Sequence, residues 1–144
     1  MLQVREAVKE DFENVLELYL HLKSDIIHDD RAERTWDRIL KSDYQHLILG
    51  FIDGCLVSSC IIDICDNLTH GSRPFAVIEN VVTHSDYRRK GYASFVLEYA
   101  KEIAVENDCY KIMLMTGSKE EGVKKFYIKE SYNSDDKIAF IQWL

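Results

Sequence analysis

Three consecutive cations stand directly before a glycine in HSDYRRKGYASF, residues 84–95. Arg88, Arg89 and Lys90 precede Gly91, and apolar residues then recur at helical spacing. The unpaired N–H groups and the dipole at the start of a helix favour bound anions, and a glycine there lets a ligand approach the backbone closely. Basic side chains oppose the dipole at this position, so a purely structural role fits them poorly. This pattern predicts a site for an anion such as phosphate, with a solvated surface run as the alternative.

A carboxylate inside an apolar, β-rich run is the second feature that could do chemistry. Glu79 lies in FAVIENVVT, residues 75–83. Burial in such a strand would raise the pKa of its carboxyl toward neutrality, which suits a general base. The alternative is a glutamate that faces water at the end of the sheet or pairs with Arg73.

The hydrophobic periodicity predicts which elements position these residues. Asp53-Gly54 is typical of a hairpin turn between two strands. Asp11 is placed to cap the first turn of the first helix. We expect strands near residues 3–6, on both sides of Asp53-Gly54 within 46–64, and at 75–83, 111–116 and 137–144, and helices near 12–20, 32–40, 92–104 and 123–127. This order predicts an α/β fold, a mixed sheet with helices packed on it.

Length and composition narrow the classes of protein that fit. A chain of 144 residues with 47% hydrophobic residues predicts one globular domain spanning 1–144. The net charge of −7 argues against general nucleic-acid binding. No apolar run approaches the roughly 20 residues of a membrane span, and the first residues carry charges where a signal peptide is apolar. The four cysteines include no C-x-x-C pair, so we expect reduced, mostly buried thiols, no metal site and a cytoplasmic location.

Three segments together resemble a known superfamily. The pattern R-x-x-G-x-A of Arg88, Gly91 and Ala93 resembles the acyl-CoA pyrophosphate loop, Q/R-x-x-G-x-G/A, of the GNAT N-acetyltransferases. FYIKESY, residues 126–132, is similar to their late FYxxxGF element, and residues 4–19 are similar to their first strand and helix. The chain departs from the pattern in lacking the usual Asn upstream of FY and in having Ser131-Tyr132 in place of GF.

The resemblance implies a fold and a co-substrate. It implies a mixed, mostly antiparallel sheet of about six or seven strands, flanked by about four helices, with the central strands splayed apart. Acetyl-CoA would be the co-substrate, with its pantetheine arm between residues 77–83 and 111–116, and no metal would be needed. The implied coenzyme-binding residues are Val81, Val82, Thr83, Arg88, Arg89, Lys90, Gly91, Tyr92, Ala93 and Ser94.

The resemblance also implies catalytic roles. Glu79 would deprotonate the amine, although some relatives use ordered waters instead. Tyr127 would protonate the leaving thiolate, since a phenol can donate a proton, and the alternative is a tyrosine that only packs. A backbone N–H near Val81, in a bulged part of its strand, would stabilise the oxyanion.

The implied reaction is acetyl transfer from acetyl-CoA to the primary amine of a small molecule, an amino sugar or another small amine. Two alternatives stay open: transfer to a peptide or protein amine, and a non-catalytic acyl-CoA-binding regulatory module. We expect a small-molecule amine as partner, with no nucleic acid and no membrane. The identity of the amine, the acyl-chain length and the oligomeric state, a homodimer included, are left open.

Overall fold

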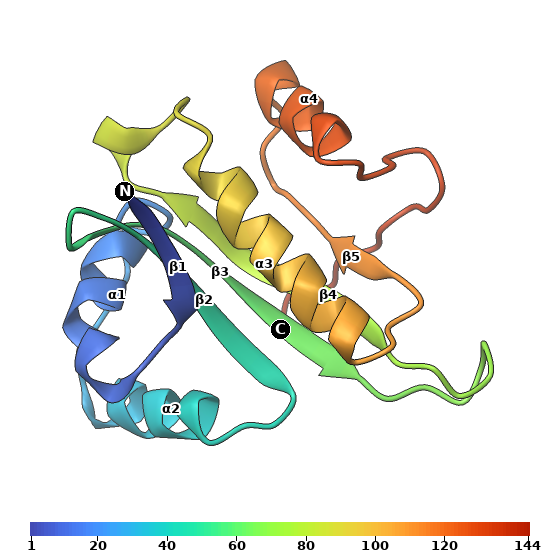
Figure 1. Cartoon of the computed structure of the whole chain (residues 1–144), viewed down its shortest axis with the longest axis horizontal. Coiled ribbons are helices and arrows are strands. Elements are labelled where there is room, and N and C mark those ends of the chain that lie inside the picture. The colour runs from blue at the N-terminus through green and yellow to red at the C-terminus, as the bar shows by residue number, and fades with distance from the viewer. The chain divides into compact units, whose positions relative to one another are not determined.

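The computed structural model describes residues 1–144, which divide into two compact units, 1–114 and 115–144 (Figure 1). The first unit holds most of the regular structure, and the second holds one helix. In chain order the first unit contains β1 (Leu2–Glu6), η1 (Lys9–Asp11), α1 (Phe12–Tyr19), α2 (Asp30–Leu40), β2 (Gln45–Ile52), β3 (Cys55–Cys65), β4 (Phe75–Thr83), η2 (Ser85–Tyr87), α3 (Tyr92–Glu106) and β5 (Ile112–Leu114). The second unit contains α4 (Glu121–Lys129). This α/β order confirms the predicted class.

The five strands form one sheet in the order β1-β2-β3-β4-β5. Neighbouring strands are antiparallel except β4 and β5, which are parallel. The hairpin between β2 and β3 turns at Asp53 and Gly54, whose φ angles of 48° and 83° are both left-handed. A turn with two left-handed residues matches the twist of the flanking strands, so the predicted hairpin is confirmed.

The pairing between β4 and β5 is short. Ala76, Val77 and Ile78 pair with Ile112, Met113 and Leu114, where β5 ends. β4 continues for five residues beyond this point, to Thr83, and pairs there with β3 alone. The backbone of residues 79–83 is therefore free of β5 on that side, as splayed central strands require.

Helices cover both faces of the sheet (Figure 1). Leu49 and Phe51 of β2 pack in one cluster with Val15 of α1 and Trp36 of α2. Gly50, between them, faces the other side, where a Cβ atom would lie 3.2 Å from Val96 Cγ1 of α3. The absence of a side chain at Gly50 thus lets α3 approach β2, whereas Trp36, 6% exposed, belongs to the core on the opposite face.

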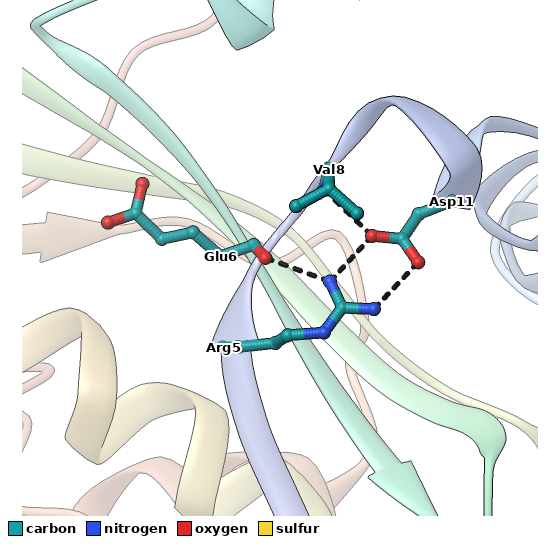
Figure 2. Close-up of polar contacts among 4 residues, drawn as sticks. All are labelled: Arg5, Glu6, Val8 and Asp11. Atoms are coloured by element: carbon teal, nitrogen blue, oxygen red, sulfur yellow. Dashed lines mark hydrogen bonds and ion pairs between the residues drawn. The ribbon is translucent and has the colours of Figure 1, made fainter.

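Asp11 does not cap α1 through its side chain, contrary to the sequence prediction. Its carboxylate instead accepts hydrogen bonds from Arg5, at 2.6 Å from Nη1 and 2.9 Å from Nη2, and from the Val8 N–H at 2.8 Å (Figure 2). The hydrogen bond from Arg5 holds the pKa of Asp11 below its ordinary value, against the opposing effect of burial. This partly buried ion pair ties the end of β1 to the turn that starts α1.

Two other expectations are wrong. Residues 137–144 form no strand, so the sheet has five strands rather than six or seven, and Ile138, Phe140 and Trp143 are exposed. An apolar, β-prone segment becomes a strand only where a neighbouring strand completes its hydrogen bonds, which sequence does not reveal. Of the four free cysteines only Cys60 is buried, and Cys55 is exposed.

No helix combines the length and the apolar character that crossing a membrane requires.

Candidate active site

The link between β4 and α3 contains two residues with left-handed backbone conformation. His84 starts the η2 turn, and its Nδ1 accepts a hydrogen bond from the Asp86 N–H at 3.2 Å. Arg89 and Gly91 then adopt φ angles of 62° and 82°. A left-handed glycine costs no side-chain clash, whereas a left-handed arginine is uncommon, and successive turns of this kind aim backbone N–H groups into a concavity that suits anions. We name residues 88–94 the basic loop.

The cations of the basic loop differ in what they contact. Arg88 donates from Nε to the Thr83 carbonyl at 3.0 Å and from Nη2 to the His21 carbonyl at 3.2 Å. Lys90 donates to the Asp86 carbonyl at 3.1 Å and lies 5.1 Å above the Tyr87 ring. Arg88 and Lys90 therefore help to shape the loop, and Arg89 keeps a guanidinium that is free of side-chain hydrogen bonds within the chain.

The start of α3 leaves room for a ligand. A Cβ atom at Gly91 would meet nothing within 4 Å, so the space beside its Cα is open. The Ser94 N–H bonds to the Gly91 carbonyl at 3.1 Å and closes the first helical turn. The N–H groups of Tyr92 and Ala93 come before that bond, where a helix has no carbonyl of its own to offer them. Open space, unpaired helical amides and nearby cations together fit a bound phosphate.

A β-bulge interrupts β4 close to the basic loop in sequence. Ile61 pairs with Glu79 and Ser59 pairs with Val82, so Asn80 and Val81 both lie opposite Cys60. Asn80 has a φ of 52°. One extra residue of this kind bends the strand and takes backbone groups out of the ladder, which is why bulges recur beside active sites. The structure has a bulge where the resemblance implies an oxyanion site.

Glu79 is exposed, contrary to the expectation of burial. The bulge follows Glu79 directly, and the pairing of β4 with β5 ends at the residue before it. The apolar residues that flank Glu79 therefore do not enclose it. Arg73 does not pair with it either, because Nε of Arg73 lies 3.1 Å from Oδ1 of Asp108. Burial therefore does not support Glu79 as a base, and that role stays a prediction from its place beside the bulge.

Sequence reasoning missed Tyr19, which α1 places against the bulge. The side chains of Asn80 and Ser59 interact with its hydroxyl and lower its pKa, but burial dominates and raises the pKa of Tyr19 to about 12. An asparagine within an apolar strand tolerates left-handed backbone better than other residues, and that preference is a signal for the bulge beside the family resemblance.

The remaining predicted residues lie in two different units. Val81, Val82 and Thr83 complete β4 in the first unit, with Val82 buried and the other two half-buried. Tyr127 lies on α4 in the second unit, where its ring is 5.1 Å from that of Phe126 and 5.9 Å from that of Tyr132. The role of Tyr127 as proton donor rests on the sequence resemblance.

The sequence also matches a known protein family. The sequence model of the acetyltransferase (GNAT) family matches residues 3–131. The chain belongs to the GNAT acetyltransferase family. An acetyltransferase of Yersinia pestis (strain Pestoides F) is 25% identical over 138 residues, which cover 95% of this chain and 92% of that protein.

Solved GNAT structures superpose over almost the whole chain. A putative acetyltransferase from Agrobacterium tumefaciens is 30% identical, with a TM-score of 0.90 and coverage of 98% of this chain and 99% of that one. Glucosamine-6-phosphate N-acetyltransferase from Arabidopsis thaliana is 20% identical, with a TM-score of 0.87 and coverage of 99% and 98%. AAC(6')-Iy, in complex with the bisubstrate analogue CoA-S-monomethyl-acetylneamine, is 17% identical, with a TM-score of 0.83 and coverage of 100% and 99%. The last two likenesses concern the fold alone.

Proposed function

We propose that this GNAT protein transfers an acetyl group from acetyl-CoA to the primary amine of a small molecule, with amino sugars as the leading class of acceptor. The observation that carries the proposal is the basic loop: left-handed Arg89 and Gly91 precede the open first turn of α3. We further propose that residues 1–144 act as one acetyltransferase domain.

In this proposal the backbone of the basic loop holds the pyrophosphate of the coenzyme. The N–H groups of Tyr92 and Ala93 would donate to its oxygens, and Arg89 would add a charge-assisted bond. Val81, Val82 and Thr83 would hold the pantetheine arm, because β5 leaves this part of β4 unpaired. Arg88 would act indirectly, by fixing the loop through its bonds to two carbonyls.

The transfer itself needs three things from the protein. The amine must lose a proton, the oxyanion of the tetrahedral intermediate must be stabilised, and the departing thiolate must gain a proton. We assign the oxyanion to a backbone N–H of the bulge near Val81, deprotonation to Glu79 directly or through water, and protonation of the thiolate to Tyr127. Because Glu79 is exposed, a water relay is as consistent with its position as direct contact.

The acceptor class is supported by the neighbours whose fold this chain shares. One is named for glucosamine-6-phosphate, and another is bound to an acetylneamine analogue joined to CoA. A peptide or protein amine is the second candidate acceptor, and an acyl-CoA-binding module without chemistry is the third possibility.

The test combines binding with turnover. Calorimetric titration with coenzyme A should show one site per chain. The protein is then incubated with acetyl-CoA and one amine at a time: glucosamine-6-phosphate, an aminoglycoside or a lysine peptide. Thiol should be released with only some of these amines. Turnover with the sugars alone would support the proposal, and turnover with the peptide alone would favour the second candidate. Binding without turnover with any amine would indicate the module, and the absence of binding would refute the coenzyme site.

A further inference from the structure

The turn that leads into the basic loop touches a distant part of the chain. Arg88 donates from Nη2 to the carbonyl of His21 at 3.2 Å, and the Ser85 N–H donates to Nδ1 of the same residue at 3.4 Å. His21 lies just after the end of α1, 64 positions before Ser85. The left-handed Arg89 persists only where its surroundings hold it, and His21 contacts the residue before it from outside the loop.

Two histidines from different elements stack at this point. The ring of His21 lies against that of His84, with 4.1 Å between the ring centroids, and the Tyr87 ring meets His84 edge-on at 5.5 Å. The Asp86 N–H donates to Nδ1 of His84 at 3.2 Å, as the Ser85 N–H does to Nδ1 of His21. A ring nitrogen accepts a hydrogen bond only when it carries no proton. Both imidazoles are therefore neutral in this arrangement, with the proton of each on Nε2.

The surroundings of the pair oppose its protonation. Partial burial, the neighbouring His84 and the Arg88 guanidinium lower the pKa of His21, and Asp86 has the opposite, smaller effect. A proton on Nδ1 of His21 would leave the Ser85 N–H without its acceptor and put a second cation beside Arg88. A proton on Nδ1 of His84 would likewise remove the acceptor of the Asp86 N–H. Acid therefore weakens the contact between the end of α1 and the turn before the basic loop.

We propose that His21 and His84 are positioning residues: while both rings are neutral they dock the basic loop on the end of α1, and their protonation releases the loop and weakens coenzyme binding. This inference rests on the proposed function, because it takes the basic loop as the coenzyme site. Its sign differs from that of a simple charge effect. An added cation near the loop would attract a phosphate and tighten binding in acid, whereas release of the loop lowers the fraction of protein that is ready to bind.

The first test compares coenzyme A binding of wild type and His21→Asn by calorimetric titration from about pH 8 to about pH 5, across the ordinary pKa of histidine. The Oδ1 of asparagine accepts a hydrogen bond as Nδ1 does but does not titrate in this range. Wild-type affinity should fall about three- to tenfold more than that of His21→Asn, the worth of one neutral hydrogen bond. The titration of the coenzyme itself affects both proteins equally. Affinities that fall in parallel, or a wild type that binds relatively more tightly in acid, would overturn the proposal.

The second test removes the acceptor at all pH values. His21→Leu should lower coenzyme affinity about three- to tenfold even at about pH 8, and wild-type affinity there in the folded variant would contradict the docking role. His70→Asn is the matched control, because the His70 ring is also stacked, 3.9 Å from that of Tyr110, but lies between β3 and β4. Asparagine also tolerates its left-handed φ of 54°. His70→Asn should keep the pH dependence of wild type, and loss of the pH response in this control would also contradict the assignment to His21.

NMR titration of the protein alone keeps this inference apart from the proposed function. The ring nitrogen shifts of His21 and His84 should show the Nε2–H tautomer at neutral pH, and the N–H signals of Ser85 and Asp86 should move as the two rings become protonated. If no coenzyme binds, the proposed function fails, while these signals still decide whether the pair docks the loop. A proton on Nδ1 of either ring at neutral pH, or a Ser85 N–H signal that does not respond to protonation of His21, would refute the docking role.

Discussion

Replacing Gly91 with alanine should weaken coenzyme A binding far beyond its effect on folding. Gly91 has a φ of 82°, and a Cβ atom there would meet no protein atom within 4 Å. The chain offers a matched control in Gly54, at the turn between β2 and β3, with a φ of 83° and equally open surroundings. Both substitutions therefore introduce the same backbone strain without a clash, and only one of them lies in the basic loop.

The expected magnitudes follow from this match. A left-handed L-residue costs roughly 1–2 kcal/mol, so both variants should lose about that much free energy of unfolding. For a chain of this size, such a loss lowers Tm by about 3–7 °C. A basic loop that relaxes from its left-handed turn would also lose at least one charge-assisted hydrogen bond to the pyrophosphate, at about 1.5–3 kcal/mol. Coenzyme affinity should then fall about 10- to 150-fold in Gly91→Ala.

The assay is calorimetric titration of wild type, Gly91→Ala and Gly54→Ala with coenzyme A, alongside thermal unfolding of the three proteins. Similar Tm values for the two variants with a loss of affinity in Gly91→Ala alone would support the pyrophosphate assignment. Wild-type affinity in a folded Gly91→Ala protein would refute it. An equal loss of affinity in Gly54→Ala would show that the effect is general destabilisation.

Three further substitutions test separate parts of the account. Glu79→Gln should lower turnover at neutral pH by roughly a hundredfold or more if Glu79 is the base, and the loss should shrink at high pH, where the amine is already neutral. Wild-type turnover of this variant across the pH range would exclude Glu79 as the base. Tyr127→Phe should lower kcat while the affinity for coenzyme A stays within a few-fold, and an acyl donor with a more acidic thiol should partly restore kcat. Equal sensitivity of wild type and variant to the acidity of the thiol would show that the hydroxyl gives no proton. Asp11→Asn should lower the free energy of unfolding at pH 7 by about 1–3 kcal/mol. Because the folded pKa of Asp11 is depressed, this difference should be full above its unfolded pKa of about 3.9 and should shrink as the pH falls below that value toward the folded pKa. Urea unfolding at several pH values would measure it, and a difference that stays constant as the pH falls below about 3.9 would contradict the ion pair.

The elements that the sequence predicts well are those with a local cause. The Asp53-Gly54 turn follows from the ease with which these residues adopt positive φ, and α3 follows from a sustained apolar stripe. The basic loop is also local, because its cations and glycine lie within four consecutive positions. The left-handed conformation of Gly91 follows from a local preference of glycine, whereas that of Arg89 does not.

The features that the sequence did not predict depend on contacts between distant segments. The exposure of Glu79 follows from where β5 ends along β4. Asp11 does not cap α1 as expected, because its carboxylate accepts hydrogen bonds from Arg5 of β1 and from the Val8 N–H instead. In each case a local propensity lost to a tertiary interaction.

The most direct test of the central claim is whether acetyl transfer depends on an amine and balances mole for mole. Wild-type protein is incubated with acetyl-CoA and glucosamine-6-phosphate, thiol release is followed with a thiol reagent, and the acetylated amine is counted by mass spectrometry. The account predicts amine-dependent thiol release matched by an equal amount of N-acetylated sugar, with both signals reduced in Gly91→Ala and unchanged in Gly54→Ala. Coenzyme binding without any acetylated product, from this sugar or from any other amine, would contradict it.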